Sequence, residues 1–204
     1  IGYERDELLD MGPQDIKPAY TRAELDALFD ETIRQGKTTT IETVHRRKDG
    51  STFPVEVFLR AIQSDGRDYL IAAVRDVTLR QQAQDELRRF AMAIEASTDA
   101  IGMATPEGRH FYQNASFKRM FGYATAEELA AIGGGPALYA DPNVAREVFG
   151  AIYSGQAWSG EAAMRAKDGR ELTVLLRANP VQDQDGALLA VLGVHTDISA
   201  RKEA

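Results

Sequence analysis

An internal repeat is the feature that most limits how this chain of 204 residues can fold. Four landmarks recur in one order at offsets of 119 to 121 residues: Gly2-Tyr3 as Gly122-Tyr123, Gly36 as Gly155, Lys48-Asp49-Gly50 as Lys167-Asp168-Gly169, and Asp76 as Asp197. A constant order with nearly constant spacing indicates a duplicated structural unit. The chain is therefore expected to contain two copies of one domain.

Each copy carries the pattern of an amphipathic helix downstream of its Gly-Tyr pair. In the first copy, Thr21 followed by Glu24 forms a capping box that begins a helix, and Gly36 ends it. The apolar positions have helical spacing: Leu25, Leu28, Phe29 and Ile33 in the first copy, and Val144, Val148 and Ile152 in the second. Gly155 ends the second helix in the same way.

Three strands separated by Asp-Gly turns are expected after this helix in each copy. Asp-Gly pairs suit the positive φ angles of tight hairpins, and they occur at 49–50, 65–66, 168–169 and 185–186. Between them apolar residues alternate on one strand face: Phe53, Val55, Val57 and Leu59, then Leu172, Val174, Leu176 and Ala178. This pattern predicts an antiparallel meander.

The second copy has a further hairpin upstream. Ile101 and Met103 alternate along one strand, residues 106–108 form a turn, and 111–114 form the return strand. The first copy begins at Ile1, the counterpart of Phe121, and lacks the equivalent of 99–120. We therefore expect the first domain to be truncated, without its opening hairpin and with an exposed sheet edge that either the omitted residues or a partner chain would cover.

A helix is predicted to connect the two copies. The strand ending at Asp76 is followed by Thr78 and, three residues later, Gln81, which places Thr78 at the N-cap. Downstream, a seam with a/d spacing is expected to pair two chains: Ala83, Leu87, Phe90 and Ile94. Asp197 and Ser199 occupy the corresponding positions in the second copy, where its last strand leads into the next helix. The candidate signal-coupling residues are therefore Asp76, Thr78, Asp197 and Ser199. We favour this structural role for the two aspartates over an acid or base role.

In the second copy these patterns combine into a succession that resembles the PAS family. The quoted segments, in order, are Ser97-Thr98-Asp99-Ala100-Ile101, Tyr112-Gln113-Asn114-Ala115, Phe121-Gly122-Tyr123, Trp158-Ser159-Gly160-Glu161, Lys167-Asp168-Gly169 and His195-Thr196-Asp197-Ile198. No single segment is specific, but the succession is. Asn114 could contact a ligand, although its place before Ala115 favours the N-cap of a helix.

The resemblance implies an α+β fold in which a five-stranded antiparallel sheet carries helices on one face. The expected organisation is a PAS-like domain at 1–77, a connecting signalling helix at 78–98, a complete PAS-like domain at 99–198 and the start of an exit helix at 199–204. The family also implies a sensor (PAS/PAC) fragment of a two-component or similar signal-transduction protein. Its effector, such as a histidine kinase or diguanylate cyclase, would lie in the same parent chain.

A ligand pocket between the sheet and the long helix is a further implication of the resemblance. The candidate lining residues in the second domain are Ile101, Met103, Phe117, Val148, Ile152, Trp158, Val174 and Leu192. The alternative is a structural protein–protein interaction module with a filled core and no ligand. No hydrolase, kinase or zinc-protease motif is present, so the fragment is expected not to be an enzyme.

The cofactor is unknown at this stage. Trp158 corresponds to a tryptophan near the flavin of some family members, but a core aromatic is the favoured interpretation. Haem is not expected, because neither 21–35 nor 141–155 contains a histidine; the three histidines are His45, His110 and His195. The absence of cysteine excludes disulfides, thiolate metal sites and a cysteine–flavin adduct.

Charge and hydropathy limit the partners. A net charge of -7 argues against nucleic acid, because lysine and arginine supply most of the affinity for phosphate backbones. No segment approaches the roughly 18 consecutive apolar residues of a membrane span. We expect a cytoplasmic homodimer without membrane contact by this segment.

Overall fold

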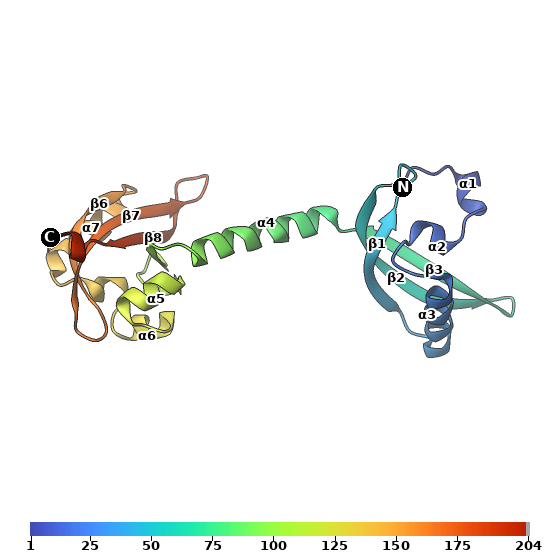
Figure 1. Ribbon diagram of the computed structural model, residues 1–204, viewed down its shortest axis with the longest axis horizontal. Coiled ribbons are helices and arrows are strands. Elements are labelled where there is room, and N and C mark those ends of the chain that lie inside the picture. The colour runs from blue at the N-terminus through green and yellow to red at the C-terminus, as the bar shows by residue number, and fades with distance from the viewer. Residues whose placement is uncertain (203–204) are drawn as a thin grey trace. The chain divides into compact units, whose positions relative to one another are not determined.

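The computed structural model describes residues 1–202 as two units, which are treated separately below. The first comprises Ile1–Leu87, and the second begins at Arg88. Figure 1 shows a mixture of helices and antiparallel strands in each unit, and α4 (Thr78–Glu95) connects them along the chain. Both the α+β class and the duplicated architecture are confirmed.

The first unit consists of three helices followed by a three-stranded meander. Its elements are α1 (Arg5–Leu9), α2 (Pro13–Ile16), α3 (Arg22–Gln35), β1 (Thr39–Arg46), β2 (Thr52–Ser64) and β3 (Arg67–Asp76), and the strand order is β1-β2-β3. Thr21 accepts the Glu24 N–H at the start of α3, and Gly36 caps its end at a φ of 63°, both as predicted. Asp65 and Gly66 have the positive φ angles expected of the hairpin between β2 and β3.

The central strand β2 supplies most of the first core. All four alternating residues predicted for its inner face are buried: Phe53, Val55, Val57 and Leu59. They pack against Leu28, Phe29 and Ile41, whereas Ile33, also assigned to the helix stripe, is 37% exposed at the far end of α3. The edge strand β3 is exposed along most of its length.

The second unit contains a complete five-stranded sheet. Its elements are β4 (Ala100–Ala104), β5 (His110–Gln113), α5 (Ala115–Phe121), α6 (Ala126–Ala131), the 3₁₀ helix η1 (Gly135–Leu138), α7 (Pro142–Tyr153), β6 (Trp158–Arg165), β7 (Glu171–Gln182), β8 (Leu188–Asp197) and α8 (Ser199–Lys202). The strand order is β5-β4-β8-β7-β6, and every pairing is antiparallel. The last strand, β8, therefore lies at the centre between β4 and β7.

The core of the second unit lies between the sheet and its helices. The four alternating residues predicted for β7 are all buried: Leu172, Val174, Leu176 and Ala178. Phe117 and Phe121 of α5 pack on one half of this face, and Val148 and Ile152 of α7 pack on the other half. The five-stranded sheet with helices on one face is confirmed for this unit.

Asn114 joins three elements of the second unit. Its Oδ1 accepts the Phe117 N–H, which confirms the predicted N-cap of α5, and also accepts the Ile101 N–H of β4. Its Nδ2 donates to the carbonyl oxygens of Ile94 and Asp99. This fully buried side chain thus connects the end of α4 to the sheet and to α5.

Candidate functional site

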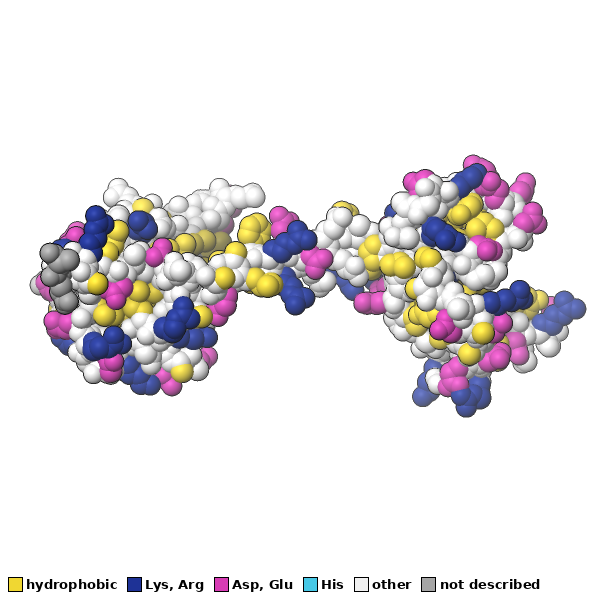
Figure 2. All heavy atoms as spheres, viewed as in Figure 1, with side chains coloured by type: hydrophobic (Ala, Val, Ile, Leu, Met, Phe, Trp, Pro, Cys, Tyr) yellow, Lys and Arg dark blue, Asp and Glu magenta, His cyan; other side chains and the backbone are white. Residues whose placement is uncertain are grey.

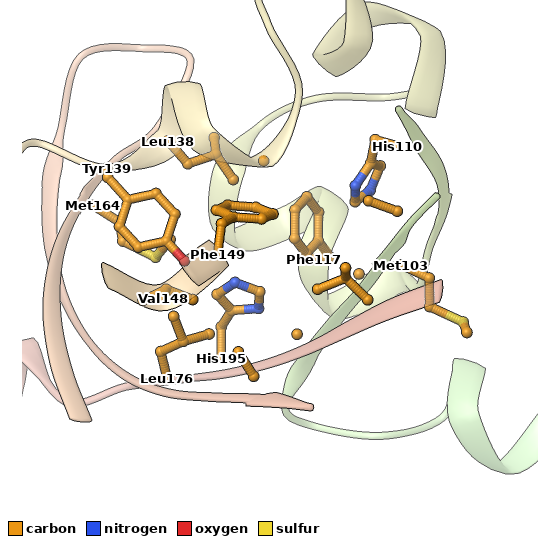
Figure 3. A pocket seen from close by; sticks show the side chains of 16 residues that line it. Met103, His110, Phe117, Leu138, Tyr139, Val148, Phe149, Met164, Leu176 and His195 are labelled. Carbon is orange, nitrogen blue, oxygen red and sulfur yellow. The ribbon is translucent and has the colours of Figure 1, made fainter. Parts of the chain in front are cut away.

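A cavity of about 50 Å³ lies between the inner face of the second sheet and the helices that cover it. Figure 3 shows the side chains that line it. They come from strands and helices throughout the unit, and the polar groups among them are His110, Tyr139 and His195. The remaining walls are apolar and include Phe117, Leu138, Val148, Phe149, Met164 and Leu176.

Two buried histidines give this cavity its polar character. His110 and His195 are each only 6% exposed. Phe117 lies between them, stacked on His110 at a centroid distance of 5.1 Å and edge-on to His195 at 5.5 Å (Figure 3). Burial lowers the pKa of each imidazole to about 4, so both rings are neutral at pH 7.

The two imidazoles present different hydrogen-bonding atoms. Nδ1 of His195 lies 3.0 Å from the Ala100 carbonyl oxygen, which can only accept, so this nitrogen carries the proton. In the neutral ring, Nε2 of His195 is then a hydrogen-bond acceptor. Nε2 of His110 is buried and has no hydrogen-bond partner among residues 1–202. Buried polar atoms are normally satisfied, so this orphaned nitrogen indicates a site for a ligand or a water molecule.

A pair of glycines makes room for the imidazoles. Gly102 of β4 and Gly193 of β8 are direct cross-strand partners on the inner face. A Cβ at Gly102 would lie 2.8 Å from Cε1 of His110, and one at Gly193 would lie 2.8 Å from Cε1 of His195. These distances are too short for a normal contact, so a side chain at either position would displace a ring. Glycine in a strand interior marks this kind of close approach.

The covering helices close the cavity with aromatic side chains. Tyr139 follows η1 and lies edge-on to Phe149 of α7 at 6.5 Å between ring centroids. Burial raises the pKa of Tyr139 above its usual range, so its hydroxyl stays protonated at neutral pH. The site therefore combines neutral hydrogen-bonding groups with apolar walls and carries no formal charge at pH 7. It can hold a small uncharged molecule.

Of the eight candidate pocket residues, three line the cavity in the structure. Met103, Phe117 and Val148 line the cavity, although the Met103 side chain points away from the rings in Figure 3. Ile152 and Val174 are buried in the core beside it. Trp158 lies at the start of β6, where its Nε1 donates to the Glu147 carboxylate at 2.9 Å instead of facing the cavity.

Ile101 and Leu192 are placed away from the cavity by strand alternation. Gly102 and Gly193 face inward, so their neighbours in the chain face the other side of the sheet. The alternation in 100–104 identifies two faces without showing which one is covered. The sequence patterns did not identify six further residues as part of the pocket: His110, His195, Tyr139, Phe149, Gly102 and Gly193. The two glycines could have been recognised, because an isolated glycine within a strand pattern indicates that another group approaches the backbone closely.

The cavity does not fit the cofactors considered from the resemblance. Pockets for organic ligands are typically ~300–1,000 Å³, several times the volume available here. The walls are the packed rings of Phe117, Phe149 and Tyr139, so neither a flavin ring system nor a haem can enter without moving them. In residues 1–202, no cluster of three or more histidines, cysteines, aspartates or glutamates could hold a metal ion.

The proposed coupling residues lie where strands lead into helices. In the first unit, Oδ1 of Asp76 accepts the Thr78 N–H at 2.9 Å and the Thr78 hydroxyl at 2.5 Å. These bonds lower the pKa of Asp76. The helix begins at Thr78 itself, so Asp76 caps it and the assignment of Thr78 as the N-cap is corrected. The Gln81 N–H, which a cap at Thr78 would bind, donates instead to the Val77 carbonyl at 2.9 Å.

The second unit repeats this junction. Oδ1 of Asp197 accepts the Ser199 N–H at 2.9 Å, and Ser199 Oγ accepts the N–H of Thr173 at 3.0 Å. The Ile198 N–H donates to the Thr173 carbonyl, as the Val77 N–H does to Pro54 in the first unit. Each junction between the last strand and the following helix is thus hydrogen-bonded to the neighbouring strand as well as to the helix.

The four seam residues are all exposed on α4. No residue of this helix is buried, and Leu87, Phe90 and Ile94 are 69%, 60% and 39% exposed. Leu79, four residues before Ala83, extends the same stripe and is 82% exposed. Figure 2 shows hydrophobic side chains at the surface of α4, among charged groups of both signs. None of the helices in residues 1–202 has the length and hydropathy needed to cross a membrane.

Comparisons with known proteins agree with this architecture. The family model described as "PAS domain" matches residues 1–79 and 98–200. The oxygen sensor protein DosP of Escherichia coli is 27% identical over 137 residues, which is 62% of this chain and 16% of DosP. The crystal structure of a PAS domain from Colwellia psychrerythraea is 25% identical with a TM-score of 0.52, and covers 57% of this chain and all of that domain. The two matched segments include most of the chain, which therefore belongs to the PAS domain family.

Proposed function

We propose that this chain is the sensory and dimerisation module of a signal-transduction protein and that the cavity of its second unit binds a small uncharged ligand. The observation that carries the proposal is the buried, unpartnered Nε2 of His110 beside an apolar cavity. PAS segments and a relative that is a sensor protein support a signal-sensing module. The effector would be a histidine kinase, a cyclic-dinucleotide enzyme or a similar domain of the parent chain.

The hydrogen-bonding groups define the ligand class. His195 Nε2 accepts, so the ligand should donate through a hydroxyl or amide group, while its remaining atoms contact Phe117, Phe149 and Leu176. A charged ligand is disfavoured, because a buried charge without an opposite charge is strongly destabilised. The volume limits the ligand to a few non-hydrogen atoms, as in a short alcohol or a small amide.

A continuous set of contacts supports coupling between the cavity and α4. Phe117 lines the cavity and belongs to α5, whose N-terminus is capped by Asn114. Asn114 also donates to the Ile94 carbonyl in the last turn of α4. Ser116 adds a hydrogen bond to the Ser97 carbonyl, and Tyr112 adds one to Glu95. A shift of Phe117 on ligand binding would therefore move Asn114, which is hydrogen-bonded to Ile94 in the last turn of α4.

The exit from the second unit offers a second route. His195 lies on β8, two residues before Asp197, and Asp197 accepts the first N–H of α8. Movement of the imidazole on ligand binding would act along this strand on the start of α8. The α4 stripe supports dimerisation, because its apolar side chains are exposed and no element of residues 1–202 buries them.

A titration followed by nuclear magnetic resonance tests ligand binding. Ethanol added to ¹⁵N-labelled protein should shift the amide signals of Gly102, Gly193 and His195. Gly193→Ala should remove the effect, because its Cβ would fill the space beside the His195 ring. Gly150→Ala is the matched control, since a Cβ there meets no atom within 4 Å. Shifts that persist in Gly193→Ala would place the ligand elsewhere.

The second candidate is the ligand-free interaction module, and the small volume of the cavity favours it. In that case the imidazoles complete a packed core and hold at most a water molecule. If short alcohols and small amides leave all signals of the second unit unchanged, the interaction module is the correct function. Association through α4 would then be the property to study.

A further inference from the structure

The carboxylate of Asp76, at the end of β3, contacts two parts of the first unit at once. Its Oδ1 accepts the backbone N–H and the hydroxyl of Thr78, and so holds the first turn of α4. Its Oδ2 lies 3.6 Å from Nη2 of Arg47, in the turn between β1 and β2. One side chain therefore connects the start of α4 to a turn far upstream in the sequence.

Arg47 also contacts the core of the first unit. Its Cζ lies over the face of the Phe53 ring, 3.9 Å from the ring centroid, where a cation is attracted to the aromatic face. Phe53 is 7% exposed on the inner face of β2 and packs edge-on against His45. The backbone of Arg47 is fixed by the turn, because its N–H donates to the Ser51 carbonyl. The guanidinium is thus held between a core ring and the carboxylate that caps α4.

The second unit lacks this arrangement at the equivalent positions. Ala166 begins the corresponding turn and is the counterpart of Arg47, and Leu172 of β7 is the counterpart of Phe53. Both counterparts lie 119 positions further along the chain, which is the offset of the repeat. Alanine has no charge to pair with Asp197, and leucine has no aromatic face. The contact from core ring to guanidinium to cap is therefore absent from the second unit.

A neutral hydrogen bond takes its place there. Ser199 Oγ accepts the N–H of Thr173 on β7. The counterpart of Thr173 in the first unit is Pro54, which has no N–H, so Thr78 cannot form the same bond. Both units share an ion pair between the following helix and the first strand of the meander, Arg80 with Glu42 and Lys202 with Glu161. The contacts of Arg47 are therefore what distinguishes the first junction.

We propose that Arg47 is a positioning residue that transmits movement of the first core to the start of α4. A displacement of Phe53 moves the guanidinium, changes its pairing with Asp76 and so alters how firmly the first turn of α4 is held. The side chains of Arg47 and Asp76 are 36% and 50% exposed, so their pairing is adjustable and contributes little to overall stability. The use of this contact in signalling rests on the proposed sensory function, whereas the contact itself is testable without a ligand.

Amide hydrogen exchange of the ¹⁵N-labelled full chain tests the role of Arg47. Arg47→Met keeps an unbranched side chain but removes the charge. It should speed exchange of the Thr78 and Gln81 N–H groups about two- to fivefold, as expected for a partly exposed ion pair with a cation–π contact. Arg47→Lys should restore most of the protection. The control Arg46→Met removes the neighbouring cation, which binds the Asp15 carbonyl, and should leave α4 unchanged.

The amides at the centre of β2 separate positioning from stability. Val55 and Val57 should exchange at the wild-type rate in Arg47→Met, because the end of a helix opens locally without unfolding the core. Equal acceleration in β2 and α4 would mean that Arg47 only stabilises the unit, which overturns the proposal. Asp76→Asn keeps an oxygen that can cap α4 but removes the charge. It should act like Arg47→Met, and the double variant should show no more than either change alone.

Phe53→Leu tests the link to the core, because leucine is the residue at the equivalent position of the second unit. Exchange at Thr78 relative to Val55 should rise when Arg47 is present and should not rise further in Arg47→Met, with circular dichroism as the folding control. The proposal is overturned if Arg47→Met leaves the Thr78 rate unchanged, or if Phe53→Leu acts equally with and without Arg47. These rates are measured in the first unit without ligand, so a failed titration of the second unit leaves them unaffected.

Discussion

Acidification from pH 7 to pH 5 should destabilise the second unit through its two buried histidines. The pKa of His195 is about 4 in the folded chain against an ordinary value of 6.5. A histidine with a lowered pKa in the folded state takes up its proton preferentially when the chain unfolds. Its stabilising contribution is therefore fully present above pH 6.5 and is lost as the pH falls from 6.5 towards 4.

The size of this effect follows from the two pKa values. The linkage relation gives a loss of roughly 2 kcal/mol per histidine between pH 7 and pH 5. His110 has the same lowered pKa, so the two together give at most about 4 kcal/mol. This is a large part of the ~5–15 kcal/mol by which a typical domain is stable. Carboxylates with lowered pKa in this unit, such as Asp168, lose their contribution mainly below pH 4.

Urea unfolding monitored by tryptophan fluorescence measures this loss. Trp158 is the only tryptophan of the chain and lies in the second unit, so its signal is separate from the titration of His45 in the first unit. The free energy of unfolding should fall by about 2–4 kcal/mol between pH 7 and pH 5. His110→Gln should reduce this difference to about half. A wild-type change below about 1 kcal/mol, or an equal change in the variant, would refute the reasoning.

Three further perturbations follow from the structure. Gly102→Ala should destabilise the second unit by about 1–3 kcal/mol, because its Cβ would lie 2.8 Å from atoms of His110 and Phe117. The control Gly150→Ala in α7 should be neutral or slightly stabilising, and urea unfolding compares the two variants. Asn114→Ala should cost about 3 kcal/mol by removing a cap and buried hydrogen bonds, and hydrogen exchange should show faster opening of the last turn of α4. Leu87→Glu should weaken dimerisation, measured by sedimentation, while the circular dichroism spectrum stays unchanged. The control Gln82→Glu lies off the seam and should leave dimerisation unchanged. Equal association of the two variants would indicate that α4 is a spacer and not a dimer contact.

Local patterns in the sequence predicted most of the secondary structure and the inner faces of β2 and β7. Phe53 to Leu59 and Leu172 to Ala178 place an apolar side chain at every second position, and burial of the face that they share removes these side chains from water. The capping box of Thr21 and Glu24 and the N-cap at Asn114 are equally local, because a helix end is satisfied by residues within one turn.

The cavity required the tertiary structure. In β4, both faces carry apolar or small residues, and only the pairing of Gly102 with Gly193 and the position of Phe117 show that the small residues face inward. The order β5-β4-β8-β7-β6 then brings His110 and His195, 85 positions apart, to the same face. Such a pair has no local signature, because strand order and the choice of covered face are decided by which distant segments pack together. The sequence by itself therefore determined the elements and the repeat, whereas long-range packing decided the site.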